Sequence, residues 1–158
     1  MIPAGSLEAL AVAQAMRDYP WLAPALRTVH TIGFAILVGS IVMFDLRVLG
    51  FSRRIPVRAL SSHLLPWTTA ALLLVVPTGL TMFAARATDL IDSTPFKIKM
   101  ALLLCAGINA AIFRTGPYQG VAQWDRDIAA PLGARLSVAA SIAIWLAIIA
   151  CGQLLGNR

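Results

Sequence analysis

Long stretches without a charged residue constrain this chain more than any other feature. The stretch 28–44 contains no Asp, Glu, Lys or Arg. With the partly polar turn before it, it reaches about 20 residues, enough at ~1.5 Å per residue to cross a ~30 Å hydrocarbon layer. Comparable stretches cover residues 59–85, 100–113 and 136–153. The stretch 100–113 is long enough once Lys97 and Lys99 are included, with their ammonium groups reaching outward. The pattern predicts an all-α integral membrane protein, a four-helix transmembrane bundle.

The composition agrees with a membrane protein and argues against a nucleic-acid-binding one. Hydrophobic residues make up 59% of the chain, charged residues 13%, and the mean hydropathy is +0.79, far from a soluble domain. The net charge is +6, but the basic residues lie at span ends rather than in a stripe with aromatic residues. We therefore expect the lipid bilayer, and no nucleic acid, as a partner. Cys105 and Cys151 match no disulfide or zinc motif.

Two segments are predicted along the chain. Residues 1–20 form an N-terminal interfacial segment, with a short helix over Leu7 to Arg17 that Ser6 caps. Residues 21–158 form the transmembrane domain. Its predicted spans are about 23–47, 62–85, 96–114 and 135–155. We expect the second span to begin along the interface and to bend near Pro77.

The positive charges predict the orientation. The densest basic cluster follows the first span and comprises Arg47, Arg53, Arg54 and Arg58. By the positive-inside rule this loop is cytoplasmic, so both termini are predicted to lie outside.

Arg27 and His30 are the first candidates for a functional site. Ionisable residues within a span are costly and are often functional, and these two, three residues apart, share a helix face. Gly33 continues that face and leaves room beside the imidazole. In the structural alternative, Arg27 extends to the headgroups and His30 hydrogen-bonds a neighbouring helix.

The depths of the side chains divide the polar groups into two layers. His63 returns from the opposite surface and differs in depth from His30 by roughly 15–20 Å, too far to share one haem or metal within a subunit. The outer layer, at the level of His30, contains Arg27, Thr78, Thr81, Met82, Lys97 and Met100. The inner layer contains Asp45, Arg47, Asn109, Arg114 and Ser137 and is interpreted as structural. We expect Asp45 to pair with Arg47, Arg114 or Arg135, and Asn109 to bond to another helix.

The outer layer is typical of a cofactor site. A neutral imidazole is a good axial ligand for haem iron, and Met can take the opposite position. Arg27 with Lys97 or Lys99 would neutralise the propionates, and a second subunit could supply another His30. The candidate cofactor-binding residues are His30, Arg27, Met82, Met100 and His63, with His30 as the metal ligand. Copper is the alternative, as Cu(I) held by His30, Met82 and Met100.

No enzyme motif accompanies these residues. The chain has no GxSxG, P-loop, GxGxxG or HExxH pattern, and two histidines without a buried carboxylate beside them make no hydrolytic triad. Whether the protein is an enzyme is left open, at most as a redox subunit.

Five stretches carry a resemblance. The run LRTVHTIGFAILVGSIVMFDLRVLG, followed by HLLPW, PTGLTMF, PFKIKMALLL and NAAIFR, resembles an uncharacterised family of small bacterial four-helix inner-membrane proteins. More distantly, the intramembrane His before a Gly-containing apolar run is similar to copper-resistance D and cytochrome b561-like membrane proteins. That resemblance implies b-type haem held by histidines, for which His30 and His63 are the available positions. It also implies the bacterial inner membrane as the location.

These observations lead to one functional hypothesis and two alternatives. The hypothesis is a redox protein or membrane subunit that binds haem b through His30 and transfers electrons between quinone or a periplasmic donor and a partner. The alternatives are a non-catalytic scaffold or accessory subunit, and a copper or small-solute permease. Four short helices enclose little interior, so we expect a homo-oligomer or a subunit of a membrane complex.

Overall fold

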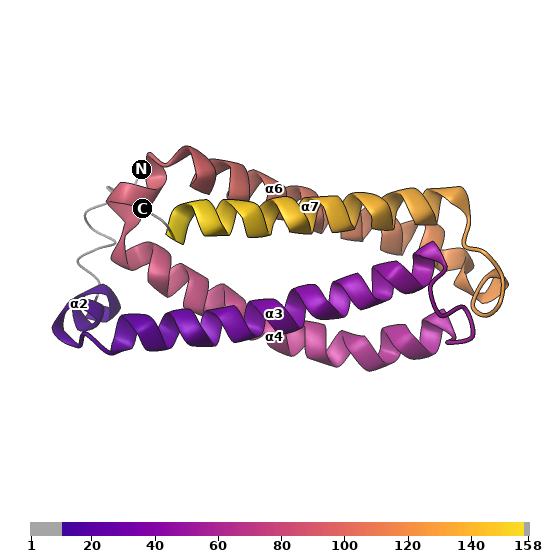
Figure 1. The fold of residues 1–158 in the computed structure, drawn as a ribbon, viewed down its shortest axis with the longest axis horizontal. Coiled ribbons are helices and arrows are strands. Elements are labelled where there is room, and N and C mark those ends of the chain that lie inside the picture. Colours follow the sequence, from indigo (N-terminus) through magenta and orange to yellow (C-terminus); the bar gives the residue numbers. More distant parts are fainter. Residues whose placement is uncertain (1–10, 157–158) are drawn as a thin grey trace.

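The computed structural model describes residues 11–156, and every secondary-structure element in this range is a helix (Figure 1). The long helices are α3 (Leu22–Leu49), α4 (Val57–Ala85), α6 (Thr94–Thr115) and α7 (Leu132–Gly156). The short ones are α2 (Ala11–Asp18), α5 (Ala87–Ile91) and the 3-10 helix η1 (Pro117–Gln123). All four long helices are long and apolar enough to cross a membrane. The predicted all-α four-helix bundle is confirmed.

The details of the helices differ from the sequence prediction in three places. α4 begins at Val57, before the predicted span, and continues through Pro66 and Pro77 as one helix. Neither α5 nor η1 was predicted. Of the predicted interfacial helix, α2 is the described part, while Ser6 and the rest of 1–10 lie outside the described residues.

The bundle has two ends, which we name after the predicted orientation. The inner end carries the loop 50–56, η1 and the loop 124–131, whereas the outer end carries α2, α5 and the last turn of α7 (Figure 1). Gly50 ends α3 at the inner end in the left-handed conformation, with φ of 117°, and its N–H donates to the carbonyls of Leu46 and Arg47. The chain can therefore turn sharply into α4.

The four long helices are arranged as two pairs. α3 packs against α4, α6 packs against α7, and α3 and α7 join the pairs. A buried cluster at the inner end is centred on Val48, Val57 and Trp124, and a second cluster links the pairs through Leu37, Trp145 and Ile148. Trp124 is therefore part of the core of the inner end.

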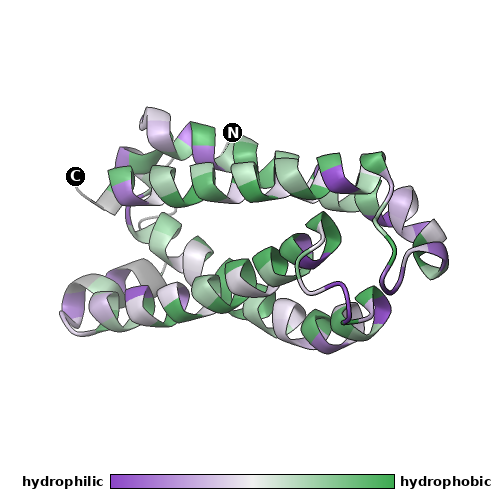
Figure 2. Cartoon of the chain, turned by 45° about the vertical axis from the view of Figure 1, so that its right-hand side comes forward, coloured by the Kyte–Doolittle hydropathy of each residue, from purple (hydrophilic) through white to green (hydrophobic). Residues whose placement is uncertain are grey.

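Apolar side chains cover the outside of the bundle. Leu73 and Leu104 are 72% and 66% exposed, and no residue of α6 is buried. In Figure 2 the hydrophobic colour follows the long helices, while hydrophilic residues gather at the ends and loops. Exposed apolar surface of this extent is suited to lipid contact.

Candidate functional site

His30 on α3 makes a hydrogen bond that fixes its ring. Its Nδ1 lies 2.9 Å from Oγ1 of Thr78 on α4. The Thr78 hydroxyl donates its single hydrogen to the carbonyl of Leu74 at 2.7 Å, so its oxygen accepts from the Nδ1–H of His30. In the neutral imidazole, Nε2 then keeps a lone pair that is free to accept a hydrogen bond or bind a metal.

Phe34 and Gly79 also lie next to the imidazole. The ring of Phe34 stacks against it, with centroids 6.5 Å apart and planes 13° apart, and Phe34 meets the ring of Trp145 on α7 edge-on at 6.0 Å. On the other side, a Cβ placed on Gly79 would lie 3.1 Å from Cε1 of His30. Gly79 therefore lets α4 approach the ring closely, and aromatic contacts connect His30 to α7.

Gly33 does not provide the space beside His30 that the sequence suggested. A Cβ at this position would lie 3.0 Å from Cγ2 of Val75 and 3.1 Å from Cδ2 of Leu74. Side chains of α4 thus fill the position, and Gly33 allows close packing of α3 on α4.

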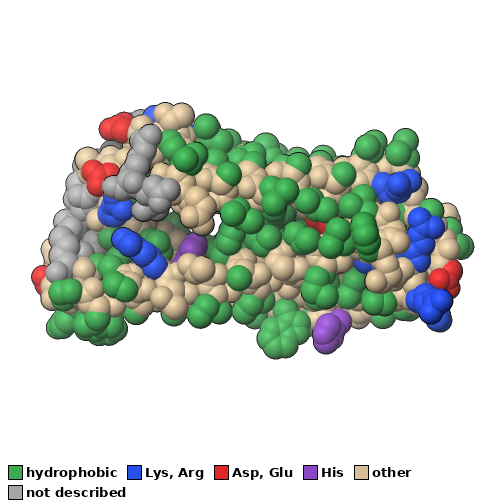
Figure 3. Space-filling model, in the orientation of Figure 1, with side chains coloured by type: hydrophobic (Ala, Val, Ile, Leu, Met, Phe, Trp, Pro, Cys, Tyr) green, Lys and Arg blue, Asp and Glu red, His purple; other side chains and the backbone are tan. Residues whose placement is uncertain are grey.

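Lys99 on α6 is a charged side chain that interacts electrostatically with the His30 ring. It is half-buried, and its Nζ would lie 4.0 Å from a Cβ placed on Gly152 of α7. All four long helices therefore meet at the level of His30. In Figure 3 one histidine ring lies inside a recess and the other projects from the outer surface, in keeping with the half-buried state of His30 and the exposure of His63.

The other predicted cofactor-binding residues are spread over the bundle. Arg27 is exposed one turn before His30, and Met100 is 49% exposed on α6. Met82 is half-buried and lies one turn after Thr78 on the same face of α4. His63 precedes Thr78 on α4 by about 22 Å along the helix axis at ~1.5 Å per residue, so the two histidines lie at different depths.

No cluster of metal ligands of the usual kind accompanies His30. Within residues 11–156, no group of three or more His, Cys, Asp or Glu side chains could hold a metal ion. Any metal at His30 would therefore need another donor, such as a methionine sulfur, a prosthetic group or a second subunit.

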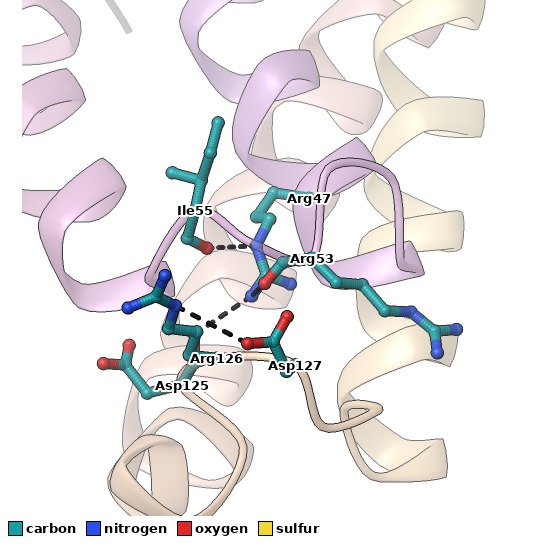
Figure 4. Close-up of polar contacts among 6 residues, drawn as sticks. All are labelled: Arg47, Arg53, Ile55, Asp125, Arg126 and Asp127. Atoms are coloured by element: carbon teal, nitrogen blue, oxygen red, sulfur yellow. Dashed lines mark hydrogen bonds and ion pairs between the residues drawn. The ribbon is translucent and has the colours of Figure 1, made fainter.

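At the inner end, buried Arg47 holds two loops together (Figure 4). Its Nε donates to the carbonyl of Ile55, and one terminal nitrogen donates to the carbonyls of Arg53 at 2.9 Å and Asp125 at 3.0 Å. The acceptors lie in the loop 50–56 and in the loop 124–131. Arg47 thus acts as a clamp across the chain, through backbone carbonyls.

Asp125 also caps the beginning of α4. Its carbonyl accepts from the N–H of Val57 at 2.9 Å, and its carboxylate accepts from the N–H of Arg58 at 2.8 Å. These are two of the N–H groups that a helix N-terminus leaves unpaired. No local sequence pattern indicates this cap, because donor and acceptor are 67 residues apart.

The predicted ion pair of Asp45 is wrong. Among the described residues, the ion pairs are Arg86–Asp89 and Arg126–Asp127, and neither involves Asp45. Asp45 is 4% exposed, Ser141 on α7 hydrogen-bonds its carboxyl group, and Oδ2 has no partner. Arg47 is two residues away, so it leaves the helix in a different direction and is occupied by its clamp contacts.

Asn109 and Ser137 join α6 to α7. Ser137 donates its hydroxyl hydrogen to Oδ1 of Asn109 at 2.9 Å, and Nδ2 of Asn109 donates to the carbonyl of Ser137 at 3.0 Å. Arg114 lies at the end of the same helix, with its guanidinium 5.6 Å from the centre of the Tyr118 ring.

Comparison with known proteins places the chain in a family without giving it an activity. Residues 20–158, which include every long helix, match the model of a family of unknown function, DUF6644. The chain belongs to the DUF6644 family. No curated protein and no solved structure matches this DUF6644 protein.

Proposed function

We propose that this DUF6644 protein is a redox protein of the bacterial inner membrane that binds haem b through Nε2 of His30. One observation carries the proposal: Thr78 engages Nδ1 of a half-buried imidazole, which leaves the Nε2 lone pair of the neutral ring as the candidate metal ligand. A hydrogen bond to the other ring nitrogen is the usual way in which a protein orients a metal-binding histidine.

The neighbouring residues have definite roles in this proposal. Thr78 and Phe34 keep the imidazole in one orientation, since they contact it from α4 and α3. Lys99, and Arg27 toward the outer surface, compensate the propionate charges. Met82, or His30 of a second subunit, would be available as a further donor. Haem would provide one-electron chemistry at this depth, between quinone or a periplasmic donor and a partner.

The absorption spectrum tests this function directly. The full chain, purified in mild detergent from haem-replete bacterial membranes, should show a Soret band that His30→Ala abolishes. His63→Ala is the matched control and should keep the band, because His63 lies at a different depth. A wild-type protein that is helical by circular dichroism but colourless overturns the haem assignment. Metal analysis of the same preparation tests Cu(I) at His30 and Met82.

A second candidate function rests on α6. No residue of α6 is buried, whereas α3, α4 and α7 each bury part of their length. A helix that contributes no buried residue to its own bundle is well placed to contact another membrane subunit. In this case the protein is an accessory subunit, and His30 serves as a bonded interhelical residue. A colourless wild-type protein, together with retention of the fold and of assembly in His30→Ala, would favour it.

A further inference from the structure

An open pocket lies at the inner end, away from His30. It has a volume of about 570 Å³ and lies where the beginning of α4 approaches the end of α6 and η1. The residues that matter here are Arg58, Ser61, Ser62, Leu65, Arg114 and Tyr118. A second hollow of about 480 Å³ adjoins it and shares Arg58, Arg114 and Tyr118.

Two arginines give the pocket its charge. Arg58 comes from α4 and Arg114 from α6, and neither takes part in an ion pair among the described residues. The one carboxylate in the lining, of Asp125, accepts a hydrogen bond from the backbone N–H of Arg58 and is occupied in capping α4. Tyr118 lies under the Arg114 guanidinium at 5.6 Å and restricts its movement. The pocket therefore offers two cations to one anionic group.

The position of the pocket favours a lipid over a soluble anion. Arg58 lies in the first turn of α4 and Arg114 in the last turn of α6, at the level of the inner headgroups in the predicted orientation. Leu65, which is 50% exposed, lies about 10 Å farther along α4 at ~1.5 Å per residue. Among the described residues, α4 and α6 meet through the stacked rings of Phe83 and Phe96 at the outer end, and their backbones do not pack closely on each other as those of α3 and α4 do. An acyl chain that follows α4 from the pocket past Leu65 therefore replaces no close backbone packing between these two helices.

We propose that this pocket binds the headgroup of an anionic phospholipid of the inner leaflet, such as phosphatidylglycerol. Arg58 and Arg114 bind the phosphate oxygens, and Ser61 and Ser62 face the glycerol part. One acyl chain extends over Leu65 between α4 and α6. Basic pockets between transmembrane helices on the cytoplasmic side are suited to such headgroups. The proposal does not depend on a cofactor at His30.

Native mass spectrometry of the full chain tests the lipid site. The protein is reconstituted with equal amounts of phosphatidylglycerol and phosphatidylcholine and then released from detergent. Wild type should retain phosphatidylglycerol. In the double variant Arg58→Gln with Arg114→Gln, the amount of retained phosphatidylglycerol should fall by about tenfold or more. Arg54→Gln with Arg126→Gln removes the same charge from exposed positions outside the pocket and should retain the lipid like wild type.

Two outcomes overturn the proposal. Equal retention in all three proteins would mean that the lipid binds only as part of the general annulus. Displacement of the lipid by millimolar inorganic phosphate would mean a site for a soluble anion. Thermal unfolding of each variant shows whether it is folded. If the double variant does not fold, the single variant Arg114→Gln replaces it. Its lipid retention should lie between that of wild type and that expected for the double variant.

Discussion

Arg47 stabilises the inner end through backbone carbonyls, and this makes its side-chain geometry more important than its charge. The planar guanidinium reaches carbonyls in two loops at once, whereas the compact ammonium of lysine has no comparable fork. Arg47 thus connects two loops that are far apart in the sequence.

We predict that Arg47→Lys destabilises the protein although it keeps the charge. It should lose at least one charge-assisted hydrogen bond, at a cost of about 2–3 kcal/mol in the free energy of unfolding. The measurement is the midpoint of SDS-induced unfolding in mixed micelles, followed by circular dichroism. Arg54→Lys, at an exposed position in the loop 50–56 that Arg47 contacts, is the control and should behave like wild type. Equal midpoints for both variants would contradict the clamp.

Asp45 shows where residue-level prediction from sequence fails. The sequence placed a carboxylate next to several arginines, and pairing them was the simplest expectation. In the structure, helix geometry turns Asp45 toward Ser141 of α7 and leaves Arg47 to the loops. Asn109, by contrast, lies in the middle of an apolar helix, where a neighbouring helix is the only nearby source of partners.

At the scale of the element, the helices could be predicted because a bilayer-length apolar run has few alternatives. Their exact beginnings and partners could not. α4 begins where Asp125 caps it, and that contact depends on a loop 67 residues farther along the chain. Which helices pair was also hidden, because the apolar faces of the spans give no strong periodicity to distinguish neighbours from lipid.

Close packing of α3 on α4 depends on Gly33, and we predict that Gly33→Leu disrupts it. Val75 and Leu74 already occupy the space that the new side chain needs, so overpacking should cost about 1–3 kcal/mol in the free energy of unfolding. Gly39→Leu is a matched control on the same helix, since a Cβ there meets nothing within 4 Å. SDS-induced unfolding compares the two variants, and a loss in Gly39→Leu equal to that in Gly33→Leu would refute the packing role.

On the scale of the whole molecule, the two ends of the bundle carry different sets of polar side chains. The outer end brings His30, Thr78 and Lys99 from three helices to one level, and the inner end holds the basic loops together. The region between them is apolar on the outside. A cofactor at one end and a lipid headgroup at the other would therefore be separate events, and variants at one end should leave the other unchanged.

The exposure of α6 leads to the prediction that the protein self-associates through this helix. Cys105 is exposed on α6 and Cys151 is buried on α7, so Cys151→Ser leaves one accessible thiol on the proposed contact face. Mild oxidation of native membranes should then give a disulfide-linked dimer on a non-reducing gel.

For comparison, the cysteine can be moved to α4 as Leu73→Cys, in a chain that carries Cys105→Ser and Cys151→Ser. Leu73 is 72% exposed, so lipid access is matched, but α4 already packs on α3 and should cross-link much less. Similar dimer yields from both positions would indicate random collision in the membrane. The absence of a dimer from Cys105 would rule out a contact between two copies in which their Cys105 residues lie close together.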